Sequence, residues 1–409
     1  MTEKSQTTLT IHEEKEDELL NSQIKIQQNN DVPVLPFPIF IWRIFLVFGV
    51  LLCSSYTIIV HLCEKDGRLP FSSAAVILMT ELIKLLLSAI MFVYKTYQSN
   101  SNNGWLKCIQ LKQILYKEFC PTTQSEEDQA TQSLPSPSTT PSTHIGFQHF
   151  VFIILPYTIP ALLYAFNNNL ALLIQLEMDP ATYQILSNFK ILSTAILFRL
   201  IIKQRITLIQ WFSLLLLLTA GIVHSYGNFD AQKAFMKSSS LPPSTCQSIS
   251  CVLHPISSST IHITTHGIIM ISAYCTVSGL SGVYTEHVMK KHSYMSIHLQ
   301  NFLLYTFGVI VNGIALIFEV HRKGITDEDF QFFRGFTYLT WILILTQSVF
   351  GMLIGFVLKY ASNIYRLFII SSAMICTTLL AMILFDLHLN SIILMSIILV
   401  CTSLYLYYR

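Results

Sequence analysis

Polar residues capable of binding an anion lie inside an apolar stretch between Pro180 and Leu200. Tyr183, Ser187, Lys190 and Thr194 are spaced i, i+4, i+7 and i+11, so they share one face of a helix. An ammonium at the centre of a membrane span costs about 2.5 to more than 10 kcal/mol unless it meets a polar cavity or a partner. Lys190 therefore predicts one of two things. Either it lines a pathway for a ligand that its ammonium attracts, or it forms an ion pair with a carboxylate of a neighbouring span.

Three further groups of charged side chains interrupt apolar runs. Glu81 and Lys84 are spaced i, i+3, which fits a self-neutralising structural pair and a substrate contact equally well. Lys359, Asn363 and Arg366 are spaced i, i+4, i+7, which predicts two cations and an amide on one face with no carboxylate nearby in sequence. Glu286 is a further carboxylate in an apolar run and is assigned a structural or gating role.

Amide and hydroxyl side chains recur in other apolar runs. Asn167, Asn168 and Asn169 form a triplet, and Asn301 and Tyr305 share one helical face further along the chain. Residues 266–289 carry a hydroxyl stripe that includes Ser278, with glycines beside it that permit close helix packing. Such a stripe of small residues indicates packing more often than binding.

The elements that position these side chains are membrane-spanning helices. Apolar residues make up 52% of the 409, charged residues 12%, and the mean hydropathy is +0.53. A soluble domain with a charged surface does not reach these values. Apolar runs of about 20 residues, the length that crosses about 30 Å of hydrocarbon, occur at ten places: 38–61, 73–96, 148–174, 180–200, 207–226, 266–289, 299–320, 336–358, 363–385 and 388–408. The predicted fold class is an all-α polytopic membrane protein.

Charge and composition between the runs predict the topology. Lysines and arginines are more numerous on one side, which favours cytosolic placement of both termini. Residues 1–37 are acidic and glutamine-rich and predict a disordered cytosolic tail, and 98–147 predict a cytosolic linker. Residues 227–265 are then a luminal loop, in which Cys246 and Cys251 are able to pair. The nine cysteines show no metal-type spacing.

The ten runs divide into two halves of five, 38–226 and 266–409. The segment Lys190–Ala195 can be laid against Phe368–Ala373. Because five is odd, the second half enters the membrane from the opposite face, which is the inverted-repeat arrangement of alternating-access carriers.

At these residues the chain resembles the nucleotide-sugar transporters, in the group of the carriers for CMP-sialic acid, UDP-galactose and UDP-N-acetylglucosamine. The asparagine triplet and Met178–Asn188 resemble most the branch labelled "probable UDP-sugar transporter". The similarity covers nearly all of residues 38–408. It rests on Thr80–Lys84, Tyr164–Asn169, Tyr183-Gln184 with Lys190-Ile191, Gly282–Glu286 with Lys290, Asn301, and Lys359–Ala361 with Asn363-Ile364.

This resemblance implies a Golgi carrier and not an enzyme, with ten helices in two inverted five-helix repeats and no cofactor or metal. It implies exchange of a cytosolic pyrimidine nucleotide sugar, a UDP-sugar or a CDP-linked polyol, for a luminal nucleoside monophosphate. Partners would be the bilayer and a second copy or a related transporter, not nucleic acid. The substrate contacts carried over are Asn168, Asn169, Tyr183, Lys190, Ser278, Asn301, Tyr305 and Lys359, and Arg366 is added as a third cation.

The residue types agree with this class of ligand. A nucleotide sugar offers phosphates, a planar base and hydroxyls, which call for fixed cations, an aromatic face and amides. The chain departs from the family at Ser187 and Asn188, where larger polar residues are usual, and at Ser362 and Arg366, which replace an aspartate and a lysine. These changes make one junction more positive and predict an enlarged or rewired pocket, so the nucleotide and the sugar stay open.

Two other classes of protein compete with a carrier. A membrane-embedded glycosyltransferase needs an acidic metal motif or a catalytic base, and the spans contain almost no carboxylate beyond Glu81, Glu286 and Asp386. A non-transporting Golgi scaffold could keep the fold and bind partner transporters or glycosyltransferases while carrying only a vestigial site.

Overall fold

The computed structural model describes residues 38–63, 70–99, 151–178, 180–238, 265–322, 332–385 and 390–409. The chain divides into two units, Met1–Ile44 and Phe45–Arg409, and all the packing described here lies within the second. The predicted tail 1–37, most of the predicted linker 98–147, and both Cys246 and Cys251 lie outside the described residues.

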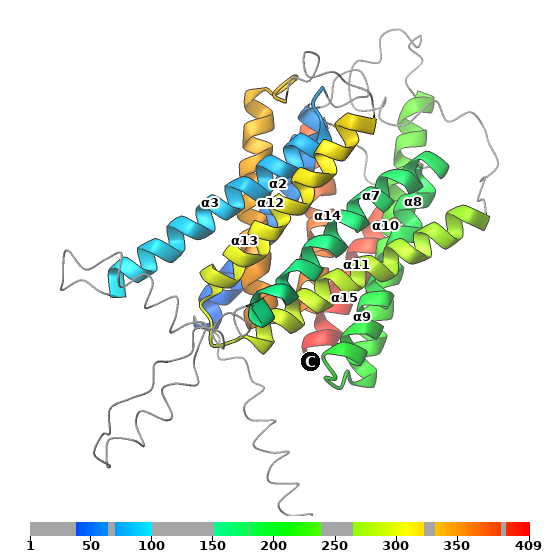
Figure 1. The fold of residues 1–409 in the computed structure, drawn as a ribbon. Coiled ribbons are helices and arrows are strands. Elements are labelled where there is room, and N and C mark those ends of the chain that lie inside the picture. Colours follow the sequence, from blue (N-terminus) through cyan, green and yellow to red (C-terminus); the bar gives the residue numbers. More distant parts are fainter. Residues whose placement is uncertain are drawn as a thin grey trace, which may run out of the picture. The chain divides into compact units, whose positions relative to one another are not determined.

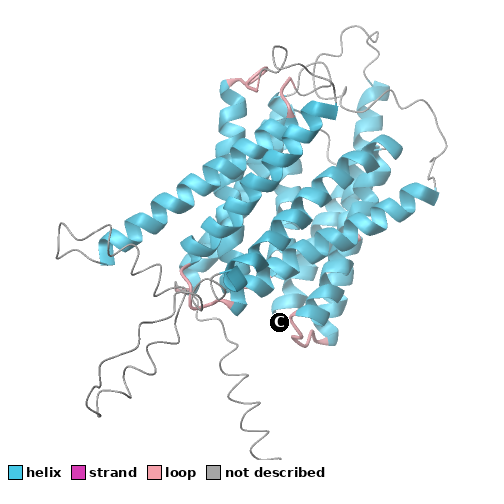
Figure 2. Cartoon of the chain, viewed as in Figure 1, coloured by secondary structure: helices cyan, strands magenta, loops and turns pink. Residues whose placement is uncertain are grey.

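The described part contains 10 helical segments long and apolar enough to span a membrane, one of them made of two consecutive helices, which confirms the predicted all-α polytopic class. The elements form α-helices with one short 3₁₀ turn and no strand among the described residues (Figures 1 and 2). They are α2 (Ile39–Cys63), α3 (Ser73–Ser99), η2 (Leu155–Tyr157), α7 (Thr158–Glu177), α8 (Pro180–Ser187), α9 (Lys190–Ile201), α10 (Leu208–Ser238), α11 (Thr265–Lys291), α12 (Ile297–Arg322), α13 (Tyr338–Tyr360), α14 (Asn363–Phe385) and α15 (Ser391–Tyr408).

Two boundaries differ from the expected ones. The fifth span was expected to end near residue 226, but α10 continues to Ser238, so the first part of the expected 227–265 loop is helical. The fourth span is interrupted, since α8 ends at Ser187 and α9 begins at Lys190.

The interruption of the fourth span has a local cause in Asn188. Its side-chain amide donates to the carbonyl oxygens of Gln184 (2.8 Å) and Ile185 (3.3 Å), and so takes over acceptors of the preceding turn. The backbone N–H of Phe189 meanwhile bonds three residues back, to Leu186 (3.0 Å). One tight turn therefore joins two helices that together make one span.

The outward faces of the helices are apolar, as hydrocarbon requires. On α12, Ile310, Ile314, Ile317 and Phe318 are spaced along one side and are all exposed. Serine and threonine hydroxyls along the helices return to carbonyl oxygens of their own helix, as Thr306 does to Phe302 (2.7 Å). These hydroxyls therefore have hydrogen-bond partners in the hydrocarbon region without any water.

Two sets of helix contacts are consistent with the predicted inverted repeats. In the two predicted repeats, the corresponding helices are α2 and α11, α3 and α12, α7 and α13, α8–α9 and α14, and α10 and α15. Each of α3 and α10 packs along its own counterpart, α12 and α15 (Figure 1). The contact of α3 with α13 likewise matches that of α7 with α12.

The two segments aligned in the sequence occupy matching places in this pattern. On α9, the Thr194 backbone is so close to Gly279 of α11 that a Cβ at position 279 would lie 3.0 Å from the Thr194 nitrogen. On α14, the Ala373 carbonyl accepts a hydrogen bond of 3.1 Å from Ser54 of α2. Each aligned segment therefore meets the first helix of the other half.

The seam between α10 and α15 is held by reciprocal hydrogen bonds. The Ser213 hydroxyl donates to the Ser403 carbonyl (2.7 Å), and the Ser403 hydroxyl donates to the Ser213 carbonyl (2.8 Å). Further along the seam, His224 Nδ1 lies 3.1 Å from the Ser396 hydroxyl. All of these side chains are buried, and none of them carries a fixed charge.

Candidate functional site

Glu81 and Lys84 form an ion pair in the interior. Lys84 Nζ lies 2.5 Å from Glu81 Oε1 on the next turn of α3, and 4.7 Å from the centroid of the Tyr305 ring on α12. Glycines make room for both side chains, because a Cβ at Gly308 would lie 2.8 Å from the Glu81 carboxylate and one at Gly351 2.8 Å from Lys84 Cδ. The predicted self-neutralising pair is present and lies against a predicted binding residue.

Arg366 is held by neutral partners. Its Nη1 donates to the Tyr164 hydroxyl (3.2 Å) and, at 3.5 Å, to Asn363 Oδ1. The guanidinium carbon lies 6.0 Å from the centroid of the Tyr164 ring. No carboxylate oxygen among the described residues lies within 4.0 Å of it. Arg366 therefore lies between α7 and α14 with no counter-ion among the described residues.

Glu286 joins α11 to the start of α14. Its side chain is fully buried, and one carboxylate oxygen accepts from the Asn363 backbone N–H (2.7 Å). The other oxygen lies 2.6 Å from Lys290 Nζ. A carboxylate at a helix N-terminus bonds an otherwise unpaired N–H and faces the positive end of the helix dipole. The predicted structural role of Glu286 thus has a physical basis.

These contacts form two groups inside the bundle. Lys84 over the Tyr305 ring links α3 to α12, while the Tyr164–Arg366 and Asn363–Glu286 contacts link α7, α14 and α11. We refer to both groups together as the polar chain. Its members are Glu81, Lys84, Tyr305, Tyr164, Arg366, Asn363, Glu286 and Lys290. It links α3, α12, α7, α14 and α11, and so includes helices from both halves.

Lys190, at the first turn of α9, lies near two thiols. It is within electrostatic reach of Cys53 on α2 and Cys275 on α11. Its ammonium makes no hydrogen bond or ion pair with any residue that the structure describes. The alternative of an ion pair with a neighbouring carboxylate is therefore not observed in this part of the chain.

The stripe predicted on the fourth span faces α11 in spite of the break. The Tyr183 and Tyr274 ring centroids are 5.7 Å apart, Lys190 lies near Cys275, and Thr194 packs against Gly279. Residues on both sides of the tight turn at Asn188 therefore still face α11.

The face predicted for Lys359, Asn363 and Arg366 is wrong. Helix α13 ends at Tyr360 and α14 begins at Asn363, so the three residues do not lie on one helix. Lys359 is buried, and its Nζ donates to the Met295 carbonyl oxygen in the turn between α11 and α12. The helical spacing failed here because the chain turns between the two spans.

The predicted amides lie in different environments. Asn301 is fully buried against Gly355, and neither atom of its amide has a hydrogen-bond partner among the described residues. Asn168 and Asn169 are exposed, and Asn169 bonds the Ala165 carbonyl of its own helix (2.9 Å). Ser278 is half-buried on α11, one turn from Gly282.

The structure places two residues, Asn188 and Tyr164, differently from what the sequence predicted. Asn188 was expected to reshape the pocket, but it faces α10, where it donates to the Ser225 hydroxyl (3.2 Å) and lies against Gly221. Tyr164 was not predicted as a site residue, although it bonds Arg366. Its i, i+4 spacing to Asn168 was the available signal.

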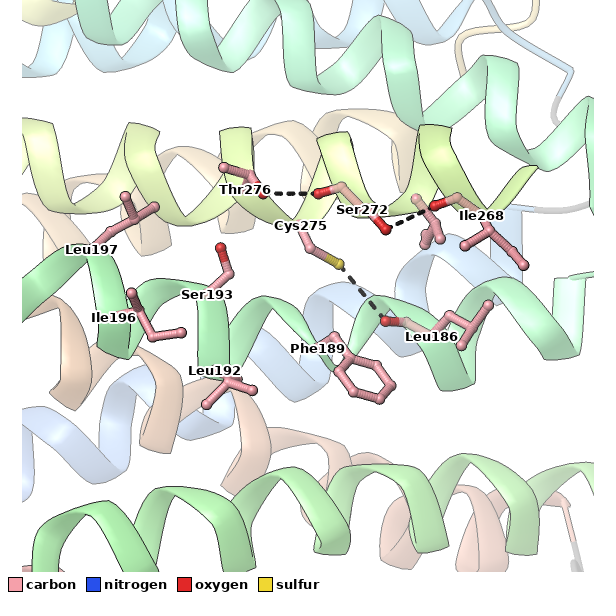
Figure 3. A pocket seen from close by; sticks show the side chains of 11 residues that line it. Leu186, Phe189, Leu192, Ser193, Ile196, Leu197, Ile268, Ser272, Cys275 and Thr276 are labelled. Carbon is pink, nitrogen blue, oxygen red and sulfur yellow. Dashed lines mark hydrogen bonds between the residues drawn. The ribbon is translucent and has the colours of Figure 1, made fainter. Parts of the chain in front are cut away.

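A separate groove of about 590 Å³ lies between α8–α9 and α11 (Figure 3). No charged residue lines it, and exposed Phe189, Ile196 and Ile268 contribute to its walls. Two of its polar side chains bond backbone carbonyls: the Ser272 hydroxyl donates to Ile268 (2.8 Å) and the Cys275 thiol to Leu186 (3.7 Å). The lining of this groove is complementary to an apolar ligand and includes no charged side chain that could bind a phosphate.

Comparison with known proteins identifies the class. Residues 151–408 match the sequence profile of the nucleotide-sugar transporter family. The chain is 32% identical over 370 residues to "Probable UDP-sugar transporter protein SLC35A4" of Xenopus tropicalis, covering 90% of this chain and 92% of the relative. It is 31% identical over 367 residues to the human protein of that name, covering 90% and 94%. The interior cations therefore lie in a carrier, and the chain belongs to the nucleotide-sugar transporter family.

Proposed function

We propose that the protein is a Golgi antiporter that exchanges a cytosolic pyrimidine nucleotide sugar for a luminal nucleoside monophosphate. The observation that carries the proposal is Lys190, a cation inside the bundle with no counter-ion among the described residues. An uncompensated ammonium at this depth is costly, and an anionic substrate removes the cost while bound. The names of the relatives support a UDP-linked sugar as one such substrate.

The remaining predicted residues supply the other parts of a nucleotide site. Tyr183 and Tyr305 offer aromatic faces for a base, and Asn168, Asn169, Asn301 and Ser278 offer groups for ribose and sugar hydroxyls. Asn301 supports this assignment, because a buried amide without a partner gains hydrogen bonds from a ligand. Lys359 joins the site when its contact with Met295 opens.

The movement that we propose for transport follows from the two predicted five-helix repeats. We propose that residues 38–226 and 266–409 rock against each other around the polar chain, which contains residues of both halves. Glu81, Lys84 and Glu286 then act as structural or gating charges. Lys84 contacts Tyr305 of the other half, so it lies where the halves separate. Glu286 holds α11 to α14 within the second half. A second copy or a related transporter is the proposed membrane partner.

Counter-transport in proteoliposomes tests this function. Vesicles loaded with uridine or cytidine monophosphate should accumulate labelled nucleotide sugar faster than empty vesicles, and free monophosphate should compete for uptake. Free sugar should not compete, because phosphate charge and base stacking supply most of the binding energy, whereas sugar hydroxyls exchange water for amides. Equal competition by free sugar would indicate a carrier of unphosphorylated solutes. Uptake that no nucleotide affects would favour a scaffold.

The topology makes a separate prediction. We expect tags inserted within residues 100–147 to be cytosolic and tags within 239–264 to be luminal, with both termini in the cytosol. After selective permeabilisation of the plasma membrane, antibody should reach the first tag and not the second. Labelling of both without opening the Golgi would contradict the assigned orientation.

A further inference from the structure

We propose that the groove between α8–α9 and α11 binds one acyl chain of a phospholipid from the surrounding bilayer. It is a lipid site on the outer surface of the bundle and does not depend on the residues assigned to the nucleotide sugar. The groove encloses about 590 Å³, which lies within the range of about 300–1,000 Å³ that is usual for small-molecule sites.

The groove opens on the side of the fourth span that faces away from the core. Ile191, Ala195 and Phe198 are buried in one core cluster, whereas Phe189 and Ile196 line the groove and are exposed. With 3.6 residues per turn, these two sets lie on different faces of the helix. Because the helices on both sides of the groove span the membrane, hydrocarbon lies against this outward face.

The lining of the groove asks for no polar partner. No charged residue belongs to the described residues that line it, and three of its four polar side chains bond backbone carbonyls. The Ser272 hydroxyl donates to Ile268 (2.8 Å), the Cys275 thiol to Leu186 (3.7 Å) and the Thr276 hydroxyl to Ser272 (2.9 Å) (Figure 3). An acyl chain carries no donor or acceptor, so it matches such a surface.

The length of the groove selects its occupant. Its lining on α11 runs from Ile268 to Thr276, a rise of about 12 Å. One turn further on the two helices touch, because a Cβ at Gly279 would lie 3.0 Å from the Thr194 nitrogen. A groove of this length covers most of one leaflet of a hydrocarbon core about 30 Å thick. A single acyl chain fits it, whereas a membrane-spanning helix of a partner or of a second copy needs the full thickness.

The bound chain would contact both predicted repeats, since α9 belongs to the first half and α11 to the second. Lipid tails are as apolar as the side chains of the groove, so transfer from bulk lipid brings no hydrophobic gain. The preference for the groove therefore comes from the additional van der Waals contacts of its walls. Such contacts are individually weak, and we expect a moderate enrichment over the rest of the lipid-facing surface.

Photochemical labelling of the reconstituted full chain tests this site. Phosphatidylcholine with a diazirine on one acyl chain is incorporated into the vesicles, and the labelled residues are located by mass spectrometry after irradiation and proteolysis. We expect residues 186–197 and 268–276 to be labelled at least about fivefold more than the exposed side of α12 at Ile310, Ile314 and Ile317. Equal labelling of the two surfaces would show ordinary bilayer contact and would overturn the proposal.

Variants that fill the groove supply a second measurement. Thr276→Phe should return the labelling of the groove to the level of α12. Thr219→Phe on α10 is the matched control, because Thr219 is also exposed and also donates to a carbonyl of its own helix (2.9 Å), and it should leave the labelling of the groove unchanged. Ser272→Phe fills the groove independently and replaces Thr276→Phe if thermal unfolding shows that the latter does not fold.

Two further reagents examine other occupants. A photoreactive sterol should label the groove less than the phosphatidylcholine does, and cysteines placed at Phe189 and Ile268 should not cross-link one copy of the chain to another. Stronger labelling by the sterol, or efficient cross-linking between copies, would overturn the assignment to an acyl chain. None of these measurements uses nucleotide transport, so their outcome is independent of the function proposed above.

Discussion

Nucleotide exchange should fall about 100-fold or more when Lys190 is replaced by alanine, and by a similar factor for every nucleotide offered. The expected loss corresponds to about 2.7 kcal/mol, within the range of a hydrogen bond to a charged group. Lys190 is the stronger target than Lys359, because Lys359 already donates to a carbonyl oxygen. Initial rates of exchange in proteoliposomes, normalised to reconstituted protein, measure the effect.

Two companion variants interpret that result. Tyr183→Ala should change the ranking of uridine against cytidine ligands, because its ring is the proposed base contact seven residues from Lys190. Arg199→Ala should leave exchange unchanged, since it removes an exposed cation of the same helix. If Lys190→Ala transports normally, the cation is not part of the substrate pathway and the proposed site is wrong.

Replacing Glu286 by leucine should lower the stability of the folded protein by about 1–3 kcal/mol, the cost of leaving the buried Asn363 N–H without its acceptor. The change leaves Lys290 without its carboxylate and the Asn363 N–H without its acceptor. Thermal unfolding of the purified protein in detergent measures this effect directly.

Glu286→Gln separates the contribution of the ion pair with Lys290 from that of the hydrogen bond donated by the Asn363 N–H. The amide oxygen can still accept from the Asn363 N–H, so this variant should lie between the wild-type protein and Glu286→Leu. Equal unfolding temperatures for the wild-type protein and Glu286→Leu would show that the contact with α14 contributes nothing to the fold.

Sequence periodicity predicted the features that depend on neighbours along one helix. The ten spans follow from apolar length, and the i, i+3 pair of Glu81 and Lys84 is present because both lie on one uninterrupted helix. The face shared by Tyr183, Lys190 and Thr194 survives because the turn at Asn188 is short.

Features that depend on turns or on distant segments could not be predicted in this way. The turn after Tyr360 separates Lys359 from Arg366, and Asn188 faces α10 because its amide bonds the preceding turn. The contact of Glu286 with Asn363 joins positions 77 residues apart. No helical period encodes that contact, since it is set by how α11 and α14 pack.

The reciprocal bonds between Ser213 and Ser403 bear on which parts of the carrier are able to move. Transport requires some helices to separate, and the charges that would respond to a substrate lie on α3, α9, α11, α13 and α14. The reciprocal contact between Ser213 of α10 and Ser403 of α15 consists of bonded hydroxyls and includes no such charge. Because α10 belongs to one half and α15 to the other, we expect this contact to persist through the cycle and to act as the pivot about which the halves rock. A cross-link between α10 and α15 near Ser213 and Ser403, or a reporter fused there, should therefore leave the transport rate unchanged.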